Sequence, residues 1–351
     1  MKKVLMMSLA LLLCLSFVGM FASCGSSSGP YNIPIVCGES GMNDVCGVAT
    51  YGVNYYNLGV KAGDMAADVL LGGEDITKMA VATDPNPALT INEKVAAAIH
   101  FSIPDSVKGK VGSDSTLSVS RVEEALISEN SNENADFTVG ILQLVQHVAL
   151  DQCNKGFVDQ LSVRMNEAGK KVKILDKNAS GDQSNNVTIA ENFANQDVDL
   201  IYSIATSSSQ ACVEAAEAKK IPVIFCAVTD PVEAGLVNSM EEPGKNVSGV
   251  SDINPVADQI DLIAELTGKE KVKIGLLYTS AETNSVVQIN MAKAECEKKG
   301  YEYVVAGIGD LNDIQNAFIT LQKSGVDAIY IPTDNTLANG VATVHSINIG
   351  E

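Results

Sequence analysis

The sequence predicts an α/β protein built from two doubly wound parallel-sheet lobes joined by a hinge, and three observations support this class. From residue 137 onward, short β-branched runs alternate with amphipathic helical stretches at the spacing of βαβ units. These runs are almost continuously apolar, as parallel strands are when helices cover both faces of their sheet. The chain has 351 residues, of which 46% are hydrophobic. That length is too great for one ordinary core and sufficient for two.

Seven strands are expected between residues 137 and 332, and one break divides them into two sheets. The segment NVSGVSDINP (246–255) interrupts the alternation between the fourth and fifth strands, so we expect one sheet to end there and the next to begin. Ligands of such sheets bind beyond the carboxyl ends of the strands, which makes the loops there candidate site segments. The expected strands are 137–142, 172–176, 199–205, 222–228, 272–278, 302–307 and 326–332.

The two ends of the chain complement each other. The amino-terminal block opens with a strand, IPIVCG (33–38), whereas the helix-like segment 336–347 near the other end has no strand after it. We therefore expect IPIVCG to pair beside VDAIYIP (326–332) in one parallel sheet, with Tyr31 close to Glu351. Chain ends that lie close together at the surface are common in compact domains.

Each lobe is therefore expected to combine segments that are far apart in the sequence. The stretch that contains GSDSTLSVS and SENSNENAD is polar and acidic, which is typical of a surface linker, and it could hold one short helix at 121–127. The expected organisation is a first lobe of 137–248 plus about 50–84, a second lobe of 31–49 plus about 85–104 plus 249–351, and a linker of 105–136.

The first residues carry an export signal. Two lysines precede an apolar run (4–21), and Ala-Ser-Cys follows at 22–24. This ending resembles the lipobox of bacterial lipoproteins, although Phe21 stands where Leu is usual, and a plain cleaved signal is the alternative. Lipidation would hold the mature protein on the extracytoplasmic face of the cell membrane. We expect a signal peptide at 1–23, a lipid anchor at Cys24 and a flexible tether over 24–30.

The composition argues against several function classes. The formal charge is −19, from 24 Lys and Arg against 43 Asp and Glu. Phosphate backbones require a basic surface, so we expect no nucleic-acid partner and attribute the acidity to solubility. The cysteines after the signal show no CxxC or Cys/His spacing for a metal ion, and each lies in or beside an apolar segment. We expect no metal, no cofactor and unpaired thiols, with a Cys37–Cys46 bridge left open as the alternative.

Two blocks of the chain carry the motifs of one family. After residue 136 they are VGILQLVQHVALD (139–151), GFVDQL (156–161), NVTIAENFANQDVDLIYSIAT (186–206), IPVIFCAVTDPVEAGLV (221–237), GKNVSGVSD (244–252), YTSAETNSV (278–286) and VDAIYIPTDNT (326–336). Before it they are IPIVCGESGM (33–42), ATYGVNYYNLGVKAGDMAADVLLGG (49–73) and LTINEKVAAAI (89–99). These stretches resemble the ABC-transporter substrate-binding lipoproteins of the tryptophan/tyrosine-binding class, which have a type I periplasmic-binding-protein fold. In that family the earlier block comes last, so the chain resembles a circular permutation in which 105–136 joins the family's usual ends.

The resemblance implies capture of a small ligand in the cleft between two lobes, for an ABC importer, with no chemistry performed on the ligand. An aromatic amino acid is the favoured ligand, the permease and its ATPase are the implied partners, and the protein is expected to be a monomer. No P-loop, GxGxxG, GxSxG or HExxH motif is present, so no catalytic residue is expected. Two alternatives stay open, a ligand sensor domain and a cofactor-independent amino-acid racemase that uses Cys37 and Cys226.

A free amino acid needs donors for its carboxylate, acceptors for its ammonium group and an apolar slot for its side chain. Thr206 and Ser207 open a helix after a strand, where unpaired N–H groups attract a carboxylate. Asp334 and Asn335 end a strand of the other lobe and suit an ammonium group, although helix capping explains such residues as well. The candidate ligand-binding residues are Gln143, His147, Thr206, Ser207, Thr229, Asp230, Ser280, Glu282, Asn284, Ser285, Asp334, Asn335, Tyr51 and Asn54.

The aromatic preference follows from the resemblance alone. The sequence has no Trp and only 5% aromatic residues, so an aromatic slot must be built from few rings and from aliphatic walls. Tyr51, Tyr55 and Tyr278 are the candidate rings. A branched-chain amino acid or a nucleoside-like heterocycle therefore stays open as the ligand.

Overall fold

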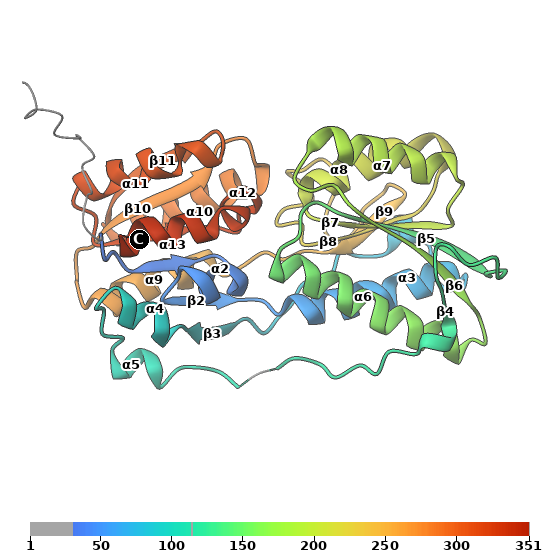
Figure 1. Ribbon diagram of the computed structural model, residues 1–351, viewed down its shortest axis with the longest axis horizontal. Helices are drawn as coiled ribbons and strands as arrows, with labels where there is room; N and C mark the ends of the chain where they lie inside the picture. Colours follow the sequence, from blue (N-terminus) through green and yellow to red (C-terminus); the bar gives the residue numbers. More distant parts are fainter. Residues whose placement is uncertain (1–30, 114, 351) are drawn as a thin grey trace, which may run out of the picture.

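The computed structural model describes residues 31–113 and 115–350 and divides them into two lobes, each built on a six-stranded sheet (Figure 1). The α/β class and the two parallel-sheet lobes that the sequence predicts are confirmed. The expected signal peptide, lipid anchor and tether lie outside the described residues. Within them, no helix has the length and apolar character needed to cross a membrane.

The first lobe has the strand order β4-β6-β5-β7-β8-β9, and all neighbouring strands are parallel. Counted from β5, the strands follow the doubly wound order 2-1-3-4-5. Helices α3 and α6 cover one face of the sheet, and α7 and α8 cover the other (Figure 1). The elements are β4 (Leu126–Ile127), β5 (Phe137–Gln143), β6 (Val172–Asn178), β7 (Leu200–Ile204), β8 (Val223–Cys226), β9 (Val247–Val250), α3 (Tyr55–Leu70), α6 (Val148–Glu167), α7 (Gln183–Asn195) and α8 (Thr206–Ala216).

Helices α3 and α6 pack unusually closely, because glycines lie at their contact. A Cβ atom added at Gly59 of α3 would lie 2.2 Å from the carbonyl oxygen of Cys153, and one added at Gly156 of α6 would lie 2.2 Å from that of Tyr56. Neither contact leaves room for a side chain. This packing attaches α3, which comes from the amino-terminal block, to the first lobe.

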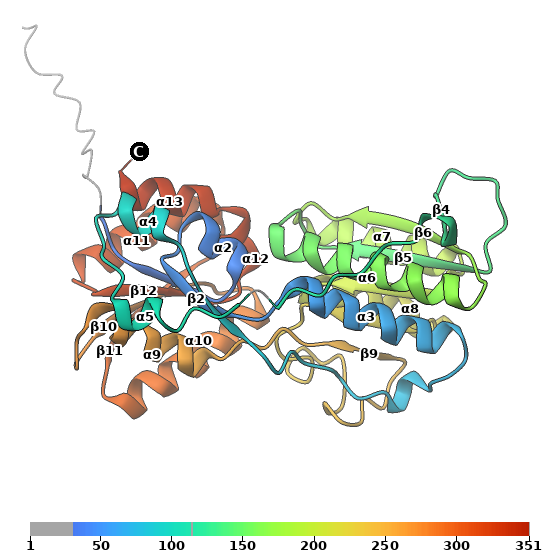
Figure 2. The same ribbon diagram turned by 90° about the horizontal axis from the view of Figure 1, so that it is seen from below.

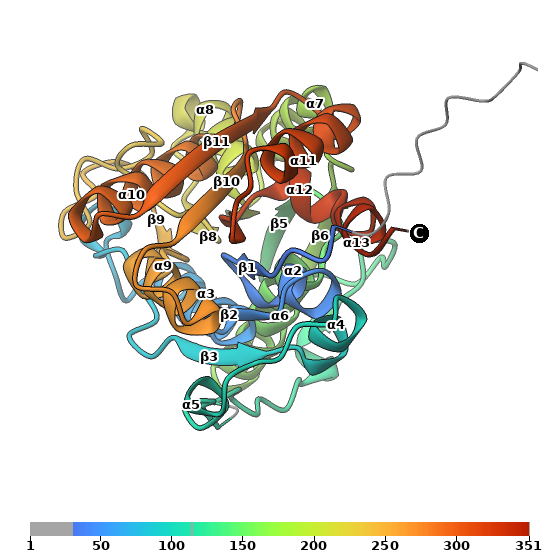
Figure 3. The same cartoon turned by 90° about the vertical axis from the view of Figure 1, so that its left-hand side faces the viewer.

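The second lobe has the strand order β11-β10-β12-β1-β2-β3, and Figure 3 shows β11, β10, β1, β2 and β3 from top to bottom. All neighbours are parallel except β3, which runs antiparallel to β2. Helices α4, α9 and α10 pack on one face, and α2, α11, α12 and α13 on the other. The elements are β1 (Ile35–Cys37), β2 (Ala49–Gly52), β3 (Ala88–Ile91), β10 (Lys273–Thr279), β11 (Glu302–Ile308), β12 (Ala328–Ile331), α2 (Ser40–Val45), α4 (Glu93–Ala98), α9 (Val256–Thr267), α10 (Thr283–Lys299), α11 (Ile314–Lys323), α12 (Asn335–Asn339) and α13 (Val341–Ile349).

The two ends of the chain meet in the second lobe. Strand β1 pairs with β12 in parallel, with Ile35 opposite Ile329, as expected for IPIVCG beside VDAIYIP. The backbone N–H of Tyr31 donates to the carbonyl oxygen of Asn348 at 2.9 Å; Glu351 itself lies outside the described residues. The second lobe repeats the 2-1-3-4-5 order of the first only when its strands are counted from β10 through the chain end and on to β1. That is the order expected of a permuted chain.

The lobe boundaries differ from the expected ones by a few residues. Residues 50–52, expected in the first lobe, belong to the second, because Tyr51 and Gly52 pair with Leu89 and Ala88 across β2 and β3. Residues 249–250, expected in the second lobe, belong to β9 of the first. The chain crosses between the lobes at 53–54, 83–87 and 251–255, and once more along the linker between α5 and β4.

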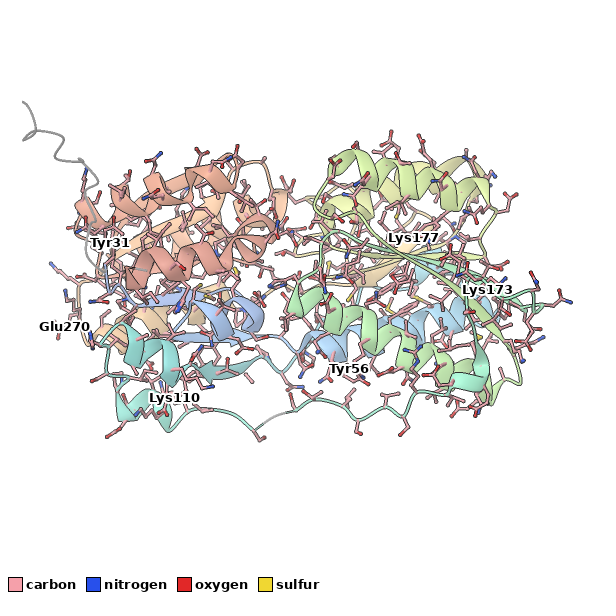
Figure 4. The ribbon with its side chains drawn as sticks, in the orientation of Figure 1. Tyr31, Tyr56, Lys110, Lys173, Lys177 and Glu270 are labelled. Atoms are coloured by element: carbon pink, nitrogen blue, oxygen red, sulfur yellow. The ribbon has the colours of Figure 1, made fainter. Side chains whose placement is uncertain are left out.

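The expected linker contains more structure than a surface loop. It begins with helix α5 (Asp105–Lys108), whose Val107 is fully buried in the second lobe, and ends with β4, which extends the first sheet beside β6. The helix expected at 121–127 is reduced to a 3₁₀ turn over Glu123–Ala125. Between these ends the described residues of the linker pass along the outside of both lobes (Figure 2), and Figure 4 shows Lys110 on the linker and Tyr56 beside it.

Candidate functional site

Loops at the carboxyl ends of both sheets face each other across a cavity of about 360 Å³. The first lobe contributes the loops after β5, β6 and β7, and the second contributes those after β10, β11 and β12. Leu144, Val145 and Leu311 form its apolar walls, and Ser207 and Glu282 are among its polar ones. A second cavity of about 510 Å³ continues between the lobes, with Asp230 on one side and Ser280 on the other.

Helix α8 begins at the cavity wall without a side-chain cap. Ala205, the residue before its first turn, has φ +84° and ψ 157°, a backbone conformation that non-glycine residues rarely adopt. Thr206 is only 4% exposed, and its Oγ1 has no hydrogen-bond partner among the described residues. Ser207 lines the cavity. The first N–H groups of α8 and the Thr206 hydroxyl are therefore donors that suit an anion.

Glu282 and Asp334, the two predicted carboxylates of the second lobe, accept hydrogen bonds from groups of their own lobe. Glu282 caps α12, since it accepts hydrogen bonds from the backbone N–H groups of Asn335 at 3.0 Å and Thr336 at 2.8 Å. Asp334 is 1% exposed and accepts bonds from the N–H and hydroxyl of Thr279, at 2.6 and 2.8 Å. Burial, and next the charge of Glu282, raises the pKa of Asp334 to about 7.

Neighbouring polar side chains complete this arrangement in the second lobe. Ser285 Oγ donates to Asp334 at 2.8 Å, and Asn284 Nδ2 donates to the carbonyl oxygen of Thr333 at 2.9 Å. Ser280 Oγ donates to the carbonyl oxygen of Ile308 at 3.0 Å. These predicted residues therefore hold the strand-end loops of the second lobe together.

A buried carboxylate that the sequence analysis missed lies behind the loop after β8. Asp252 is 1% exposed and accepts hydrogen bonds from Tyr55 Oη at 2.9 Å and from Thr229 Oγ1 at 3.2 Å. Burial raises the pKa of Asp252 to about 6. In the same loop, Asp230 Oδ1 accepts bonds from the N–H groups of Val232 and Glu233, at 3.1 and 2.9 Å. Asp230 lines the second cavity.

Side-chain contacts also join the described parts of the two lobes. His147 Nε2 of the first lobe lies 3.5 Å from Glu39 Oε1 of the second. Glu39 also accepts bonds from the N–H groups of Gly41 and Met42 at the start of α2, and burial raises its pKa. Gln288 Nε2 on α10 donates to Thr229 Oγ1 at 3.4 Å. The sequence analysis missed Glu39, although a carboxylate directly after a predicted strand was a usable signal.

Three predicted residues lie toward the hinge and the linker instead of this cavity. Gln143 Nε2 donates to Asp151 Oδ1 at 2.6 Å, in a groove beside the linker. Asn54 caps α3 and donates to Thr116 Oγ1 of the linker at 2.6 Å. Tyr51 lies in β2 and packs against the second core. The other candidate rings, Tyr55 and Tyr278, do not line the cavity either, since one is bonded to Asp252 and the other lies on β10.

The cysteines and the acidic residues offer no metal centre in the described part of the chain. No group of three His, Cys, Asp or Glu side chains there could hold a metal ion. Cys37 and Cys226, the residues of the racemase alternative, are both 0% exposed. Each contacts a cysteine of its own lobe and neither reaches the cavity.

Comparisons with known proteins agree with this architecture. A tyrosine-binding protein of Clostridioides difficile is 39% identical over 224 residues, which are 63% of this chain and 64% of that relative, so the match spans less than two thirds of its length. The solved ABC domain of Streptococcus pneumoniae in complex with L-Trp is 39% identical, with a TM-score of 0.56 over 61% of this chain and 71% of that chain. A conserved domain protein from Vibrio cholerae is 33% identical, with a TM-score of 0.55 over 61% and 71%.

The family itself matches most of the sequence. The profile described as "ABC transporter substrate binding protein" matches residues 17–113 and 138–350, in two segments that leave out much of the linker. The resemblance found in the motifs is thereby confirmed. The chain belongs to the ABC transporter substrate-binding protein family.

Proposed function

We propose that this protein is the extracytoplasmic substrate-binding component of an ABC importer and that it captures tyrosine or tryptophan between its two lobes. The observation that supports this best is the uncapped start of α8 at the cavity wall, where Thr206 Oγ1 is buried without a partner among the described residues. An amino-acid carboxylate supplies the acceptors that these donors lack. The tyrosine-binding relative and the L-Trp complex support the choice of ligand.

Asp230 is the best partner for the ligand's ammonium group. Its Oδ1 accepts two backbone hydrogen bonds, which hold the carboxylate in place and leave Oδ2 for a ligand. Asp334 and Glu282 suit this role less well, because hydrogen bonds within the second lobe already occupy their oxygens. Carboxylate and ammonium would then bind to loops that follow two strands of the first lobe.

The ligand side chain would extend toward the second lobe. A volume of about 360 Å³ lies within the range of small-molecule sites. With Leu144, Val145 and Leu311 as walls, an aromatic ring would pack on aliphatic groups and not on other rings. This arrangement accommodates a large apolar side chain without the Tyr residues that the sequence suggested.

Closure of the lobes would be the signal that the importer reads. Each lobe presents part of the site, and hinge closure around a ligand buries polar groups that only the ligand satisfies. The permease and its ATPase are the partners in this proposal, and Cys24 carries the lipid that holds the protein at the membrane. The protein acts as a monomer and leaves its ligand chemically unchanged.

A thermal-shift screen of the chain from residue 31 onward tests the proposal. The ligands are L-tyrosine, L-tryptophan, L-phenylalanine, branched-chain amino acids, nucleosides and sugars. We expect the melting temperature to rise with the concentration of an aromatic amino acid, as mass action requires. A rise confined to a sugar or nucleoside would overturn the ligand class, and no rise with any compound would overturn capture. Formation of D-amino acid during the incubation would instead indicate a racemase.

A further inference from the structure

The structure brings four of the described cysteines together as two pairs. Cys153 Sγ on α6 lies 3.4 Å from Cys226 Sγ at the end of β8. Cys37 Sγ at the end of β1 lies 3.9 Å from Cys46 Sγ, directly after α2. All four are at most 1% exposed, and each pair lies within one lobe. Nothing in the proposed capture of a ligand uses these thiols.

Both pairs lie directly behind the walls of the cleft. Cys226 ends the strand that leads to Thr229 and Asp230, and Cys153 lies on α6, which begins after His147. The segment between Cys37 and Cys46 contains Glu39, which contacts His147 across the cleft. A covalent bond within either pair would therefore fix a loop that contributes to the interface between the lobes.

We propose that each pair is a site of reversible oxidation to a disulfide, one bridge in each lobe, with a peroxide as the oxidant. The geometry supports this, because the sulfur atoms must approach by less than about 2 Å to reach bonding distance. An exported protein also occupies the compartment in which disulfides form and persist. The proposal does not depend on which ligand the cleft binds.

The reaction balances in two steps. One thiolate attacks hydrogen peroxide, which forms a sulfenic acid and releases hydroxide. The second thiol attacks the sulfenic sulfur, a sulfur–sulfur bond forms, and water leaves. Two thiols and one peroxide thus give one disulfide and two waters. A dithiol reductant reverses the change by thiol–disulfide exchange.

The two steps should differ greatly in rate. Burial raises the pKa of Cys153 and of Cys37, so little thiolate is present at neutral pH and the first step is slow. The second step is fast, because the partner thiol is already in contact. Cys212 and Cys296 are buried too, but no cysteine contacts them in the described part of the chain. Their sulfenic acids would take up more oxygen instead of forming bridges.

Peptide mass mapping of the unmodified chain tests this without any substitution. The reduced protein is treated with hydrogen peroxide, denatured, alkylated and digested. We expect two cross-linked peptide pairs, Cys153 with Cys226 and Cys37 with Cys46, each lighter by two hydrogens and each restored by dithiothreitol. Cys212 and Cys296 should be alkylated or carry added oxygen. Oxygen adducts on all the thiols with no cross-link, or cross-links that include Cys212 or Cys296 as often as the proposed pairs, would overturn the proposal.

Single substitutions provide the control. In C153A, the Cys37–Cys46 bridge should still form and Cys226 should gain oxygen. C212A removes a buried thiol without a partner and should leave both bridges unchanged. If C153A failed to fold, C46A would serve in its place, with the Cys153–Cys226 bridge as the internal reference. Loss of both bridges in a folded single variant would show that the pairs do not react independently, which contradicts the proposal.

Discussion

Glu39 and His147 face each other across the cleft, one from each lobe, with 3.5 Å between Oε1 and Nε2. Both side chains are almost fully buried, so the contact forms only while the lobes are close together. Because Glu39 also holds the start of α2, the contact links the position of that helix to the position of α6. The Glu39–His147 contact therefore indicates whether the two lobes are closed.

A double-mutant cycle on this pair should show coupling. We expect E39Q and H147A each to weaken binding of L-tryptophan or L-tyrosine, and the double variant to weaken it by less than the sum. A coupling energy of about 0.5–3 kcal/mol is typical of side chains in contact. Glu39 accepts from the N–H of Gly41 with one oxygen and from that of Met42 with the other, so the amide of E39Q keeps one of these two bonds and the start of α2 should stay partly capped. Strictly additive effects in isothermal titration calorimetry would contradict a functional contact.

Substitution of Thr206 tests the anion site. Thr206→Val keeps the shape of the side chain but removes the hydroxyl that has no partner in the described structure. A hydrogen bond to a charged group contributes about 1.5–3 kcal/mol, so we expect the affinity for the amino acid to fall about tenfold to hundredfold. Thr320→Val is the matched control, because that hydroxyl is exposed and bonds only to its own helix. Equal affinities of both variants and the unmodified protein would exclude Thr206 from the site.

Asp252 should make stability depend on pH. Its folded-state pKa of about 6 lies above the ordinary value of 3.8, so the folded protein retains a proton that the unfolded chain has lost. The contribution of this group is therefore full below about pH 4 and is lost as the pH rises toward 6. Asp252→Asn cannot titrate, so its free energy of unfolding relative to the unmodified protein should increase by up to about 3 kcal/mol over that window. Urea unfolding between pH 4 and 7 measures this difference, and a constant difference would disprove it.

The close packing of α3 on α6 predicts a large effect of one methyl group. Gly59→Ala places a Cβ atom 2.2 Å from a backbone oxygen that cannot move without shifting α6. We expect a loss of about 1–3 kcal/mol in the free energy of unfolding. Gly73→Ala is the control, since its nearest neighbour would lie at 3.4 Å, and it should change stability by less than about 0.5 kcal/mol. Similar unfolding midpoints of the two variants would show that the helices can separate.

A reordered chain tests the circular permutation. Joining Gly350 to Tyr31 through a short Gly-Ser link and opening the chain after residue 113 would restore the order 114–350 followed by 31–113. We expect this chain to fold with a similar circular dichroism spectrum and to bind the same amino acid, because the two ends already lie together. A chain opened within α10 is the control and should not fold. A reordered chain that resembled the control would refute the permutation.

Local patterns were sufficient to predict most of the sheets. All positions of β7 and β8 are buried, and such strands appear in the sequence as continuous apolar runs. The expected boundary at residue 49 was wrong because β2 extends to Gly52 through pairing with β3, a partner more than thirty residues away. Strand β4 was missed for the same reason, since two residues within a polar linker become a strand only beside β6.

The site was harder to predict than the fold. Ser207 could be placed at the cavity, with the buried Thr206 directly before it, because a strand followed by a hydroxyl-rich helix start has a clear local signature. Asp252 gains its importance from burial and from Tyr55, a partner in a distant segment that the sequence does not display. Glu39 directly follows a predicted strand, but its contact with His147 could not be predicted. Conversely, residue type alone suggested Tyr51, Tyr55 and Tyr278 as walls of the ligand slot. Tyr51 and Tyr278 pack against the core of the second lobe, and Tyr55 is bonded to Asp252.

The divided second lobe also determines when the molecule can be completed during synthesis. Strands β1, β2 and β3 leave the ribosome first. The edge of β1 that faces away from β2 has no partner until β12 has been made, near the other end of the chain. The first-lobe sheet, in contrast, is complete once β9 has emerged. Contacts of such long sequence separation slow folding and leave strand edges unpaired for longer. A nascent chain of this protein therefore carries β1, β2 and β3 without their partner strand β12 through most of translation. The short length of β1 limits the unpaired edge that it exposes to other chains.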